Sequence, residues 1–168
     1  MSSYNDWDGV PISGSSMFLQ DALPTEQWSQ KLWKDGLCNI DEQHNGIERS
    51  YGKYDWPASL HAETINTTQR WFIENTRLGV PVDFTNEGIR GICQTNGTNF
   101  PAQLAMGATW DKDLVYRTGQ VTGKEGYVLG YTNLYSPILD VPQDPRWGRM
   151  VECYGESPFL VAELGIQQ

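Results

Sequence analysis

Hydrophobic and polar residues follow two patterns along the chain, one typical of amphipathic helices and one of short buried strands. Ile65, Trp71 and Phe72 share one face of a helix that Gly79 is placed to end. Residues 1–22 show neither pattern and predict an irregular N-terminal segment. From there on, the pattern predicts helix 24–34, strand 37–40, helix 62–78, strand 80–84, helices 101–109 and 111–129, strand 133–139 and helix 158–168.

Strands that alternate with helices of this length predict a parallel sheet built from right-handed βαβ units. The predicted fold class is therefore α/β, and 168 residues are enough for one domain, residues 23–168, with a single core. In such folds the ligand sites form at the carboxyl ends of the strands. This places two polar loops, 85–91 and 140–156, as the candidate sites.

The first loop places Glu87 and Arg90 three residues apart on a turn that also contains Gly88 and Gly91. A carboxylate and a guanidinium on a glycine-rich turn suit a pair of sugar hydroxyls, because the backbone can approach a ligand there. The alternative is that Glu87 and Arg90 pair with each other in a solvated turn. The sequence of this loop leaves both interpretations open.

The second loop is denser in charge, with two carboxylates, two guanidiniums, a Trp and two prolines between residues 140 and 149. Arg149 is suited to bidentate bonds with vicinal hydroxyls, and Trp147 offers a face for a sugar ring or fills the core. The alternative is an Asp/Arg network that holds the loop, which we expect for the other three charges. Downstream, Ser157 and Pro158 predict the start of a helix.

Charge excludes some partners, because 12 basic against 21 acidic residues give a net charge of −9. Such a field repels nucleic acid and anionic lipid, so neither is expected as a partner. No apolar run is long enough for a membrane helix, and residues 1–17 lack the pattern of a signal peptide. Cys38, Cys93 and Cys153 lack metal-site spacing, so they are predicted to be small core residues, and no metal or cofactor is expected.

Three motifs in this order, Thr76 to Val82, Thr85 to Gly91 and Asp144 to Arg149, give the chain a family resemblance. In them the chain resembles glycoside hydrolase family 3, the β-glucosidase and β-xylosidase group. The similarity spans residues 62–168, in the first part of the N-terminal barrel domain of that family, and weakens back to Leu23. It rests on Gln69-Arg70, Thr76 to Val82, Thr85 to Gly91, Phe100-Pro101-Ala102, Ala108 to Asp111, Pro137 to Asp140, Asp144 to Arg149 and Glu156.

The resemblance implies a partial (β/α)8 TIM-type barrel from an exo-acting β-glycosidase that retains anomeric configuration. Its substrates would be β-glucosides or β-xylosides, and its mechanism would use two carboxyl groups about 5 to 5.5 Å apart. The family's carboxylate that grips hydroxyls of the terminal sugar falls on Glu87, and the arginine that closes its D-P-R-W-G-R run falls on Arg149. Arg90 lies where the family has His or Arg, and is a third candidate for substrate binding.

The departures from the family concern its catalytic groups. Its Lys-His pair, its nucleophilic Asp and the acid/base of a second domain have no counterpart in these 168 residues. Tyr54-Asp55-Trp56 imitates the nucleophile dipeptide, but precedes the strand 80–84 and is interpreted as a coincidence. We therefore expect a barrel fragment, truncated at both ends, whose isolated chain hydrolyses nothing.

An open fragment also leaves strand edges and helix faces unburied, and so is expected to self-associate. The alternative function is a non-catalytic carbohydrate-binding or assembly half-barrel that needs a partner chain. The compartment stays open, with a periplasmic or secreted parent enzyme as one alternative.

Overall fold

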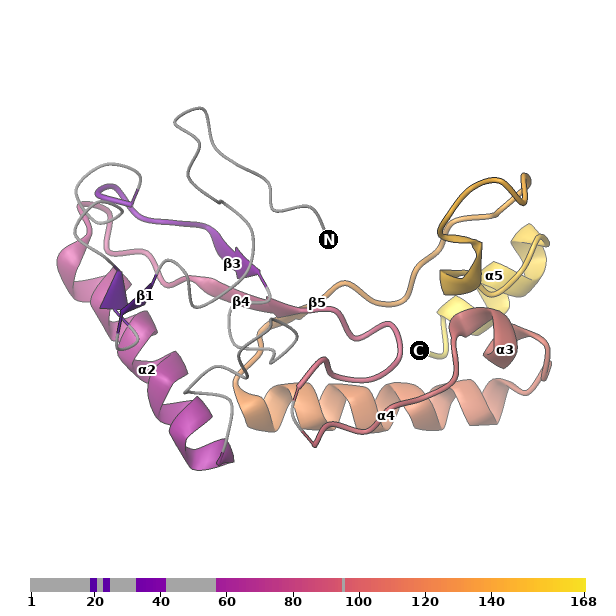
Figure 1. Ribbon diagram of the computed structural model, residues 1–168, viewed down its shortest axis with the longest axis horizontal. Coiled ribbons are helices and arrows are strands. Elements are labelled where there is room, and N and C mark those ends of the chain that lie inside the picture. The colour runs from indigo at the N-terminus through magenta and orange to yellow at the C-terminus, as the bar shows by residue number, and fades with distance from the viewer. Residues whose placement is uncertain (1–18, 21–22, 25–32, 42–56, 95) are drawn as a thin grey trace. The chain divides into compact units, whose positions relative to one another are not determined.

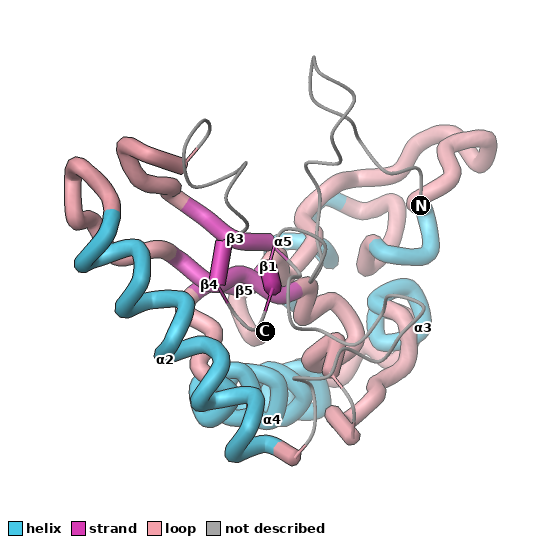
Figure 2. Tube along the Cα trace, turned by 60° about the vertical axis from the view of Figure 1, so that its left-hand side comes forward, coloured by secondary structure: helices cyan, strands magenta, loops and turns pink. Residues whose placement is uncertain are grey.

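The computed structural model describes residues 19–20, 23–24, 33–41, 57–94 and 96–168 (Figure 1). Helices account for most of the regular structure and strands are short (Figure 2). In chain order the elements are β1 (Leu19–Gln20), β2 (Leu23–Pro24), β3 (Asn39–Asp41), α2 (Ala58–Asn75), β4 (Asp83–Asn86), α3 (Gln103–Gly107), α4 (Lys112–Leu129), β5 (Asn133–Leu134), the 3₁₀-helix η2 (Met150–Glu152) and α5 (Pro158–Gly165).

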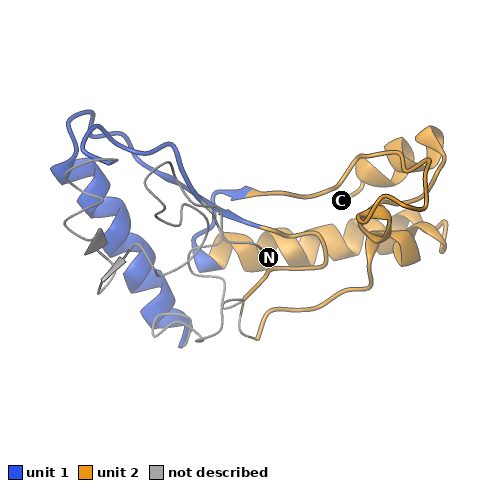
Figure 3. Cartoon of the chain, turned by 45° about the horizontal axis from the view of Figure 1, so that its top comes forward, with its two compact units in different colours: residues 1–86, 129–133 blue, residues 87–128, 134–168 orange. Residues whose placement is uncertain are grey.

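The chain divides into two compact units (Figure 3). Unit 1 contains residues 1–86 and 129–133, and unit 2 contains residues 87–128 and 134–168. Of the two candidate loops, residues 87–91 and the whole of 140–156 lie in unit 2, whereas Thr85 and Asn86 belong to β4 in unit 1. Each unit is described by itself below.

The described strands form two sheets. One has the order β3-β4-β5, and in it β3 and β4 run parallel with Asn39 opposite Asp83, so the predicted parallel sheet is confirmed. The other is antiparallel and pairs Leu19 with Pro24. β1 lies within the segment 1–22, for which the sequence pattern indicates no regular element, and it pairs with the strand two residues further on.

Helix α2 packs its buried side in unit 1, where Phe72 is fully buried and its ring lies 5.3 Å from that of Trp33. The helix begins and ends earlier than the sequence predicts. Its end is set by Thr76, whose backbone is extended and whose Oγ1 donates to the Phe72 carbonyl at 2.6 Å. That hydroxyl also accepts from the backbone N–H of Gly79 at 3.2 Å, and Gly79 has the positive φ of 61° that suits a glycine after a helix.

Two strands are shorter than predicted, and in both predicted ranges a helix side chain bonds to the backbone outside the observed strand. The backbone N–H and C=O of Val82 both bond to the side-chain amide of Gln69, each at 2.8 Å, so β4 begins only at Asp83. The backbone N–H of Ile138 bonds to the side chain of Gln103 at 3.2 Å, and β5 ends at Leu134. In both places a helix side chain takes a bond that a neighbouring strand would otherwise make.

Unit 2 has its own apolar core, formed where α3, α4, η2 and α5 meet. The buried residues of this core are Met106, Val115, Tyr154, Leu160, Val161 and Leu164. Gly107 is required there, because a Cβ at this position would lie 1.9 Å from the Tyr154 carbonyl oxygen. The predicted helix start at Ser157 is confirmed, since its Oγ accepts from the Leu160 N–H at 3.4 Å.

The glycines of α4 differ in how closely they pack. Cβ atoms at Gly119 and Gly126 would approach Gln168 and Ile92, respectively, whereas nothing lies within 4 Å of such an atom at Gly123. Gly123 is instead open to solvent.

The cysteine prediction is confirmed for Cys153, which is buried, and wrong for Cys38, which is exposed. Cys38 precedes β3, where its backbone carbonyl accepts from Asp83 N–H at 3.0 Å. Most of the predicted helix 24–34, most of the loop before α2 and the triplet 54–56 lie outside the described residues. None of the described helices is long and apolar enough to cross a membrane.

Candidate functional site

Glu87 directly follows β4, the strand whose last three residues are buried. Thr85 and Asn86 have no exposed surface, and Glu87 itself is half-buried. Gly88 then turns the chain with φ of 74°, a conformation that favours glycine. A buried strand end before Glu87 and a tight turn after it therefore fix the backbone that carries this carboxyl group.

The loop after Glu87 closes on itself. The N–H of Phe100 donates to the carbonyl of Arg90 at 2.8 Å, so the two ends of the loop are joined. Gly91 has φ of 97°, and a Cβ there would lie 1.9 Å from the Thr98 carbonyl oxygen. The root of the loop, which carries Arg90, is thus enclosed by backbone.

The structure separates Glu87 from Arg90. Among the described residues no ion pair or hydrogen bond joins their side chains, and Arg90 is exposed. The alternative in which these two residues neutralise each other in a solvated turn therefore does not occur in this structure. Both charged groups stay available to other partners.

Loop 140–149 is held mainly by local bonds. Asp144 accepts three hydrogen bonds from the side chain of Arg146, and its carbonyl accepts from Trp147 N–H at 3.0 Å. The Arg146 guanidinium lowers the pKa of the Asp144 carboxyl group below its usual value. The network predicted to hold this loop is confirmed for this pair.

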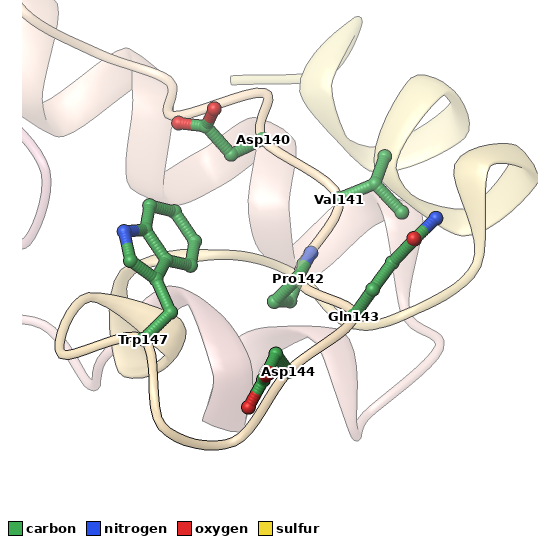
Figure 4. Close-up of a pocket in the computed structure, with 6 residues that line it drawn as sticks. All are labelled: Asp140, Val141, Pro142, Gln143, Asp144 and Trp147. Atoms are coloured by element: carbon green, nitrogen blue, oxygen red, sulfur yellow. The ribbon is translucent and has the colours of Figure 1, made fainter.

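The same loop lines an open pocket of about 310 Å³ (Figure 4). Its lining residues all come from this one segment and are Asp140, Val141, Pro142, Gln143, Asp144 and Trp147. Trp147 keeps 38% of its surface exposed, so its indole is available as a face and does not fill the core. An exposed aromatic ring beside carboxylate and amide groups is the kind of surface that a sugar ring contacts.

Arg149 lies at the end of this loop and binds Glu152 through Nε at 2.7 Å and Nη2 at 2.6 Å. These bonds and the charge of Glu152 raise the pKa of Arg149, and the charges of Glu87 and Asp140 add to the effect. Glu87 and Arg149, predicted from separate loops, therefore lie close enough in unit 2 to interact electrostatically. Arg90 shows no such interaction with Arg149.

Glu152 is a residue beside Arg149 that the sequence analysis does not predict. Its spacing of three residues from Arg149 is the signal that could have found it, since such pairs face each other on a helical turn. Cys153, next to it, is buried, and its burial and the nearby Asp140 raise the pKa of its thiol. The described residues contain no cluster of three His, Cys, Asp or Glu that could hold a metal ion.

Comparison with known proteins decides the family. Residues 46–168 match the family described as the Glycosyl hydrolase family 3 N terminal domain, which is well over half of the chain. The chain belongs to glycosyl hydrolase family 3. The resemblance carried by the two loops is thereby confirmed, and both loops lie inside the matched region.

Relatives in glycosyl hydrolase family 3 share about a third of the matched residues. A putative β-xylosidase from Formosa agariphila is 35% identical over 103 residues, which is 61% of this chain and 14% of that protein. A mutant β-glucosidase from Listeria innocua in complex with laminaribiose is 37% identical, with a TM-score of 0.57 over 63% of this chain and 14% of its own.

A β-glucosidase from Erythrobacter marinus matches the fold over a longer stretch. Its TM-score is 0.71 over 83% of this chain and 18% of its own, at 24% identity. The predicted fold class, α/β and part of a (β/α)8 TIM-type barrel with parallel strands, is confirmed. The chain spans between 14% and 18% of the length of these proteins.

Proposed function

We propose that this chain forms part of a retaining, exo-acting β-glycosidase and contributes the side chains that grip the terminal sugar. The substrates would be β-glucosides or β-xylosides, the classes in the names of its relatives. Glu87 and Arg149 would bind hydroxyl groups of the terminal ring, with Arg90 as a weaker contact. The observation that carries this proposal is the electrostatic interaction of Glu87 with Arg149, two residues 62 positions apart in the sequence.

The state of the two groups suits hydroxyl binding. The Glu87 carboxylate forms no hydrogen bond or ion pair with any described residue, so its oxygens are free to accept from sugar hydroxyls. Arg149 stays protonated and more than half exposed while Glu152 fixes its guanidinium. A cation held by Glu152 and a carboxylate within its electrostatic reach together offer donors and acceptors, as a vicinal diol requires.

The same residues do not perform the chemistry of hydrolysis. A retaining mechanism needs one carboxyl group as nucleophile and a second as acid/base. We assign neither role within these 168 residues, because no segment matches the family's nucleophile or acid/base. The chain alone is expected to bind sugar and to leave an aryl β-glucoside intact.

The test measures sugar binding by NMR titration of the chain with methyl β-D-glucoside and methyl β-D-xyloside. Glu87→Gln and Arg149→Lys should each weaken binding about tenfold or more, because each leaves a sugar hydroxyl without its charged partner. Glu163→Gln and Arg77→Lys are matched controls, since both residues form surface ion pairs elsewhere in the chain. They should bind sugar like the unaltered chain.

Two results would contradict the proposal. One is unchanged sugar affinity in both site variants. The other is turnover of an aryl β-glucoside by the chain alone that Glu87→Ala abolishes, because this would place catalysis within these residues. Recovery of hydrolysis when the missing part of a family barrel is co-expressed would support an enzyme and not a bare binding module.

A further inference from the structure

Glu125 lies on α4 and binds a single residue of the loop that follows Glu87. Its Oε2 accepts from the backbone N–H of Thr98 at 3.0 Å, and its Oε1 accepts from the Thr98 hydroxyl at 2.5 Å. Both oxygens of one carboxylate are thus used on a residue 27 positions away. Glu125 forms no ion pair with any described Lys or Arg, so this is the contact to which its charge is committed.

Thr98 in turn packs closely against the root of the loop, at Gly91. Its carbonyl oxygen occupies the space beside Gly91, where even a methyl group would come within 1.9 Å. Two residues further on, Phe100 N–H closes the loop onto the Arg90 carbonyl at 2.8 Å. A residue that holds Thr98 therefore holds the backbone of Arg90 and Gly91 as well.

A second contact joins the same helix to the same loop. Ile92 is buried, and its side chain packs over Gly126, where a Cβ would lie 3.1 Å from Ile92 Cδ1. Gly126 is the neighbour of Glu125, so α4 provides a polar and an apolar anchor at adjacent positions. The apolar anchor limits how far the loop lies from the helix, and the carboxylate fixes its lateral position, because a bidentate bond is directional.

We propose that Glu125 is a positioning residue that, through Thr98, fixes the loop root that carries Arg90 and Gly91, and Gly91 in turn bridges to Gly88, the residue next to Glu87. It touches no sugar itself. Displacement of a binding group by about 1 Å is enough to lose much of its contribution, so a distant anchor of this kind affects binding. The sugar-binding part of this inference rests on the function proposed above, whereas the anchoring part does not.

The experiment compares Glu125→Ala and Glu125→Gln with the unaltered chain. Glutamine keeps an acceptor for the Thr98 N–H and offers an N–H to the Thr98 hydroxyl, so it should restore the anchor that alanine removes. Glu163→Ala is the matched control, because Glu163 also bonds its carboxylate to one partner in unit 2, Lys112, but away from the loop. Circular dichroism and melting curves establish that each variant is folded under the conditions used.

Two quantities are measured on each variant. The first is hydrogen exchange of the Phe100 amide, which reports closure of the loop on Arg90, and the second is affinity for methyl β-D-glucoside by NMR titration. In Glu125→Ala we expect Phe100 exchange about tenfold faster and sugar affinity about five- to tenfold weaker, as for loss of a charge-assisted bond. Glu125→Gln should recover most of both, and Glu163→Ala should change neither.

The inference is overturned if Glu125→Ala leaves Phe100 exchange unchanged, or speeds it without weakening sugar affinity. It is also overturned if Glu163→Ala has the same effects, since they would then report general destabilisation. If the unaltered chain binds no sugar, the proposed function fails for this chain, and Phe100 exchange alone decides whether Glu125 anchors the loop.

Discussion

The two loops of the candidate site are held in different ways, although both belong to unit 2. The loop after β4 is held by the fold around it, through backbone packed against Gly91 and a helix that binds Thr98 and Ile92. Loop 140–149 is held largely by its own side chains, through Asp144 with Arg146 and through Arg149 with a residue three positions on.

This difference predicts how each loop responds to change. Residues packed against buried or close-packed backbone cannot shift without moving their neighbours. Single substitutions there therefore lower the free energy of unfolding strongly. Ion pairs in water are weak because solvent and salt replace them. The loop that carries Glu87 should therefore be sensitive to single substitutions, and the loop that carries Trp147 should tolerate them.

The sharpest test exchanges one glycine in each loop for alanine. Gly91→Ala combines a positive φ with a Cβ placed 1.9 Å from the Thr98 carbonyl oxygen. We expect it to lower the free energy of unfolding by about 3–5 kcal/mol, from backbone strain and overpacking together. Chemical denaturation followed by circular dichroism measures the loss.

Gly148→Ala is the matched change in the other loop, where nothing lies within 4 Å of the added carbon. Its unfolding free energy should stay within about 0.5 kcal/mol of the unaltered chain. Equal losses in the two variants would show that both loops are enforced by the fold, and the contrast between them would be wrong.

Acid separates buried from exposed groups in a single experiment. His61, on α2, is fully buried with its ring 5.6 Å from that of Tyr131, and burial lowers its pKa from 6.5 to about 4. Because the folded pKa is the lower one, protonation favours the unfolded chain as the pH falls from 6.5 toward 4. The stability lost over that range should reach about 3 kcal/mol at most.

The exposed pair of loop 140–149 should respond later in the same titration. Arg146 lowers the pKa of Asp144 below 3.8, so the carboxylate keeps its partner until the pH falls below that value. The free energy of unfolding is measured between pH 7 and 3.5 for the unaltered chain and for His61→Phe, and the difference isolates the histidine. Plotted against pH, the two free energies should have the same slope only above pH 6.5. Parallel curves throughout would show that His61 is not buried in neutral form.

Local signals explain most of what the sequence predicts correctly. The helices that begin near Asp111 and at Ser157 carry their own capping side chains, with Asp111 Oδ1 accepting from Leu114 N–H at 2.9 Å. Glu87 and Arg149 are candidates because each of their motifs follows a predicted strand, and their electrostatic interaction agrees with the parallel topology inferred from the pattern.

What the sequence did not predict depends on partners that are distant along the chain. The start of β4 depends on Gln69, whose side chain takes both backbone bonds of Val82 across 13 positions. The anchor of the Glu87 loop depends on Glu125, 27 positions from Thr98. The hydrophobic periodicity of a sequence shows which face of an element is apolar. It does not show which helix side chain will bond to the backbone of another segment.

The smallest expected effect belongs to the most exposed ion pair. The side chain of Arg146 is 89% exposed, and although it binds Asp144 through several hydrogen bonds, water and salt compete with each of them. Arg146→Ala should therefore leave the melting temperature unchanged within error at 0.15 M salt, and Arg77→Ala, whose partner Asp35 is also exposed, should do the same. A clear drop confined to Arg146→Ala would mean that loop 140–149 needs its ion pair to keep its shape. The two loops would then differ only in degree in how firmly they are held. The shape of the pocket beside Trp147 would also depend on the salt concentration.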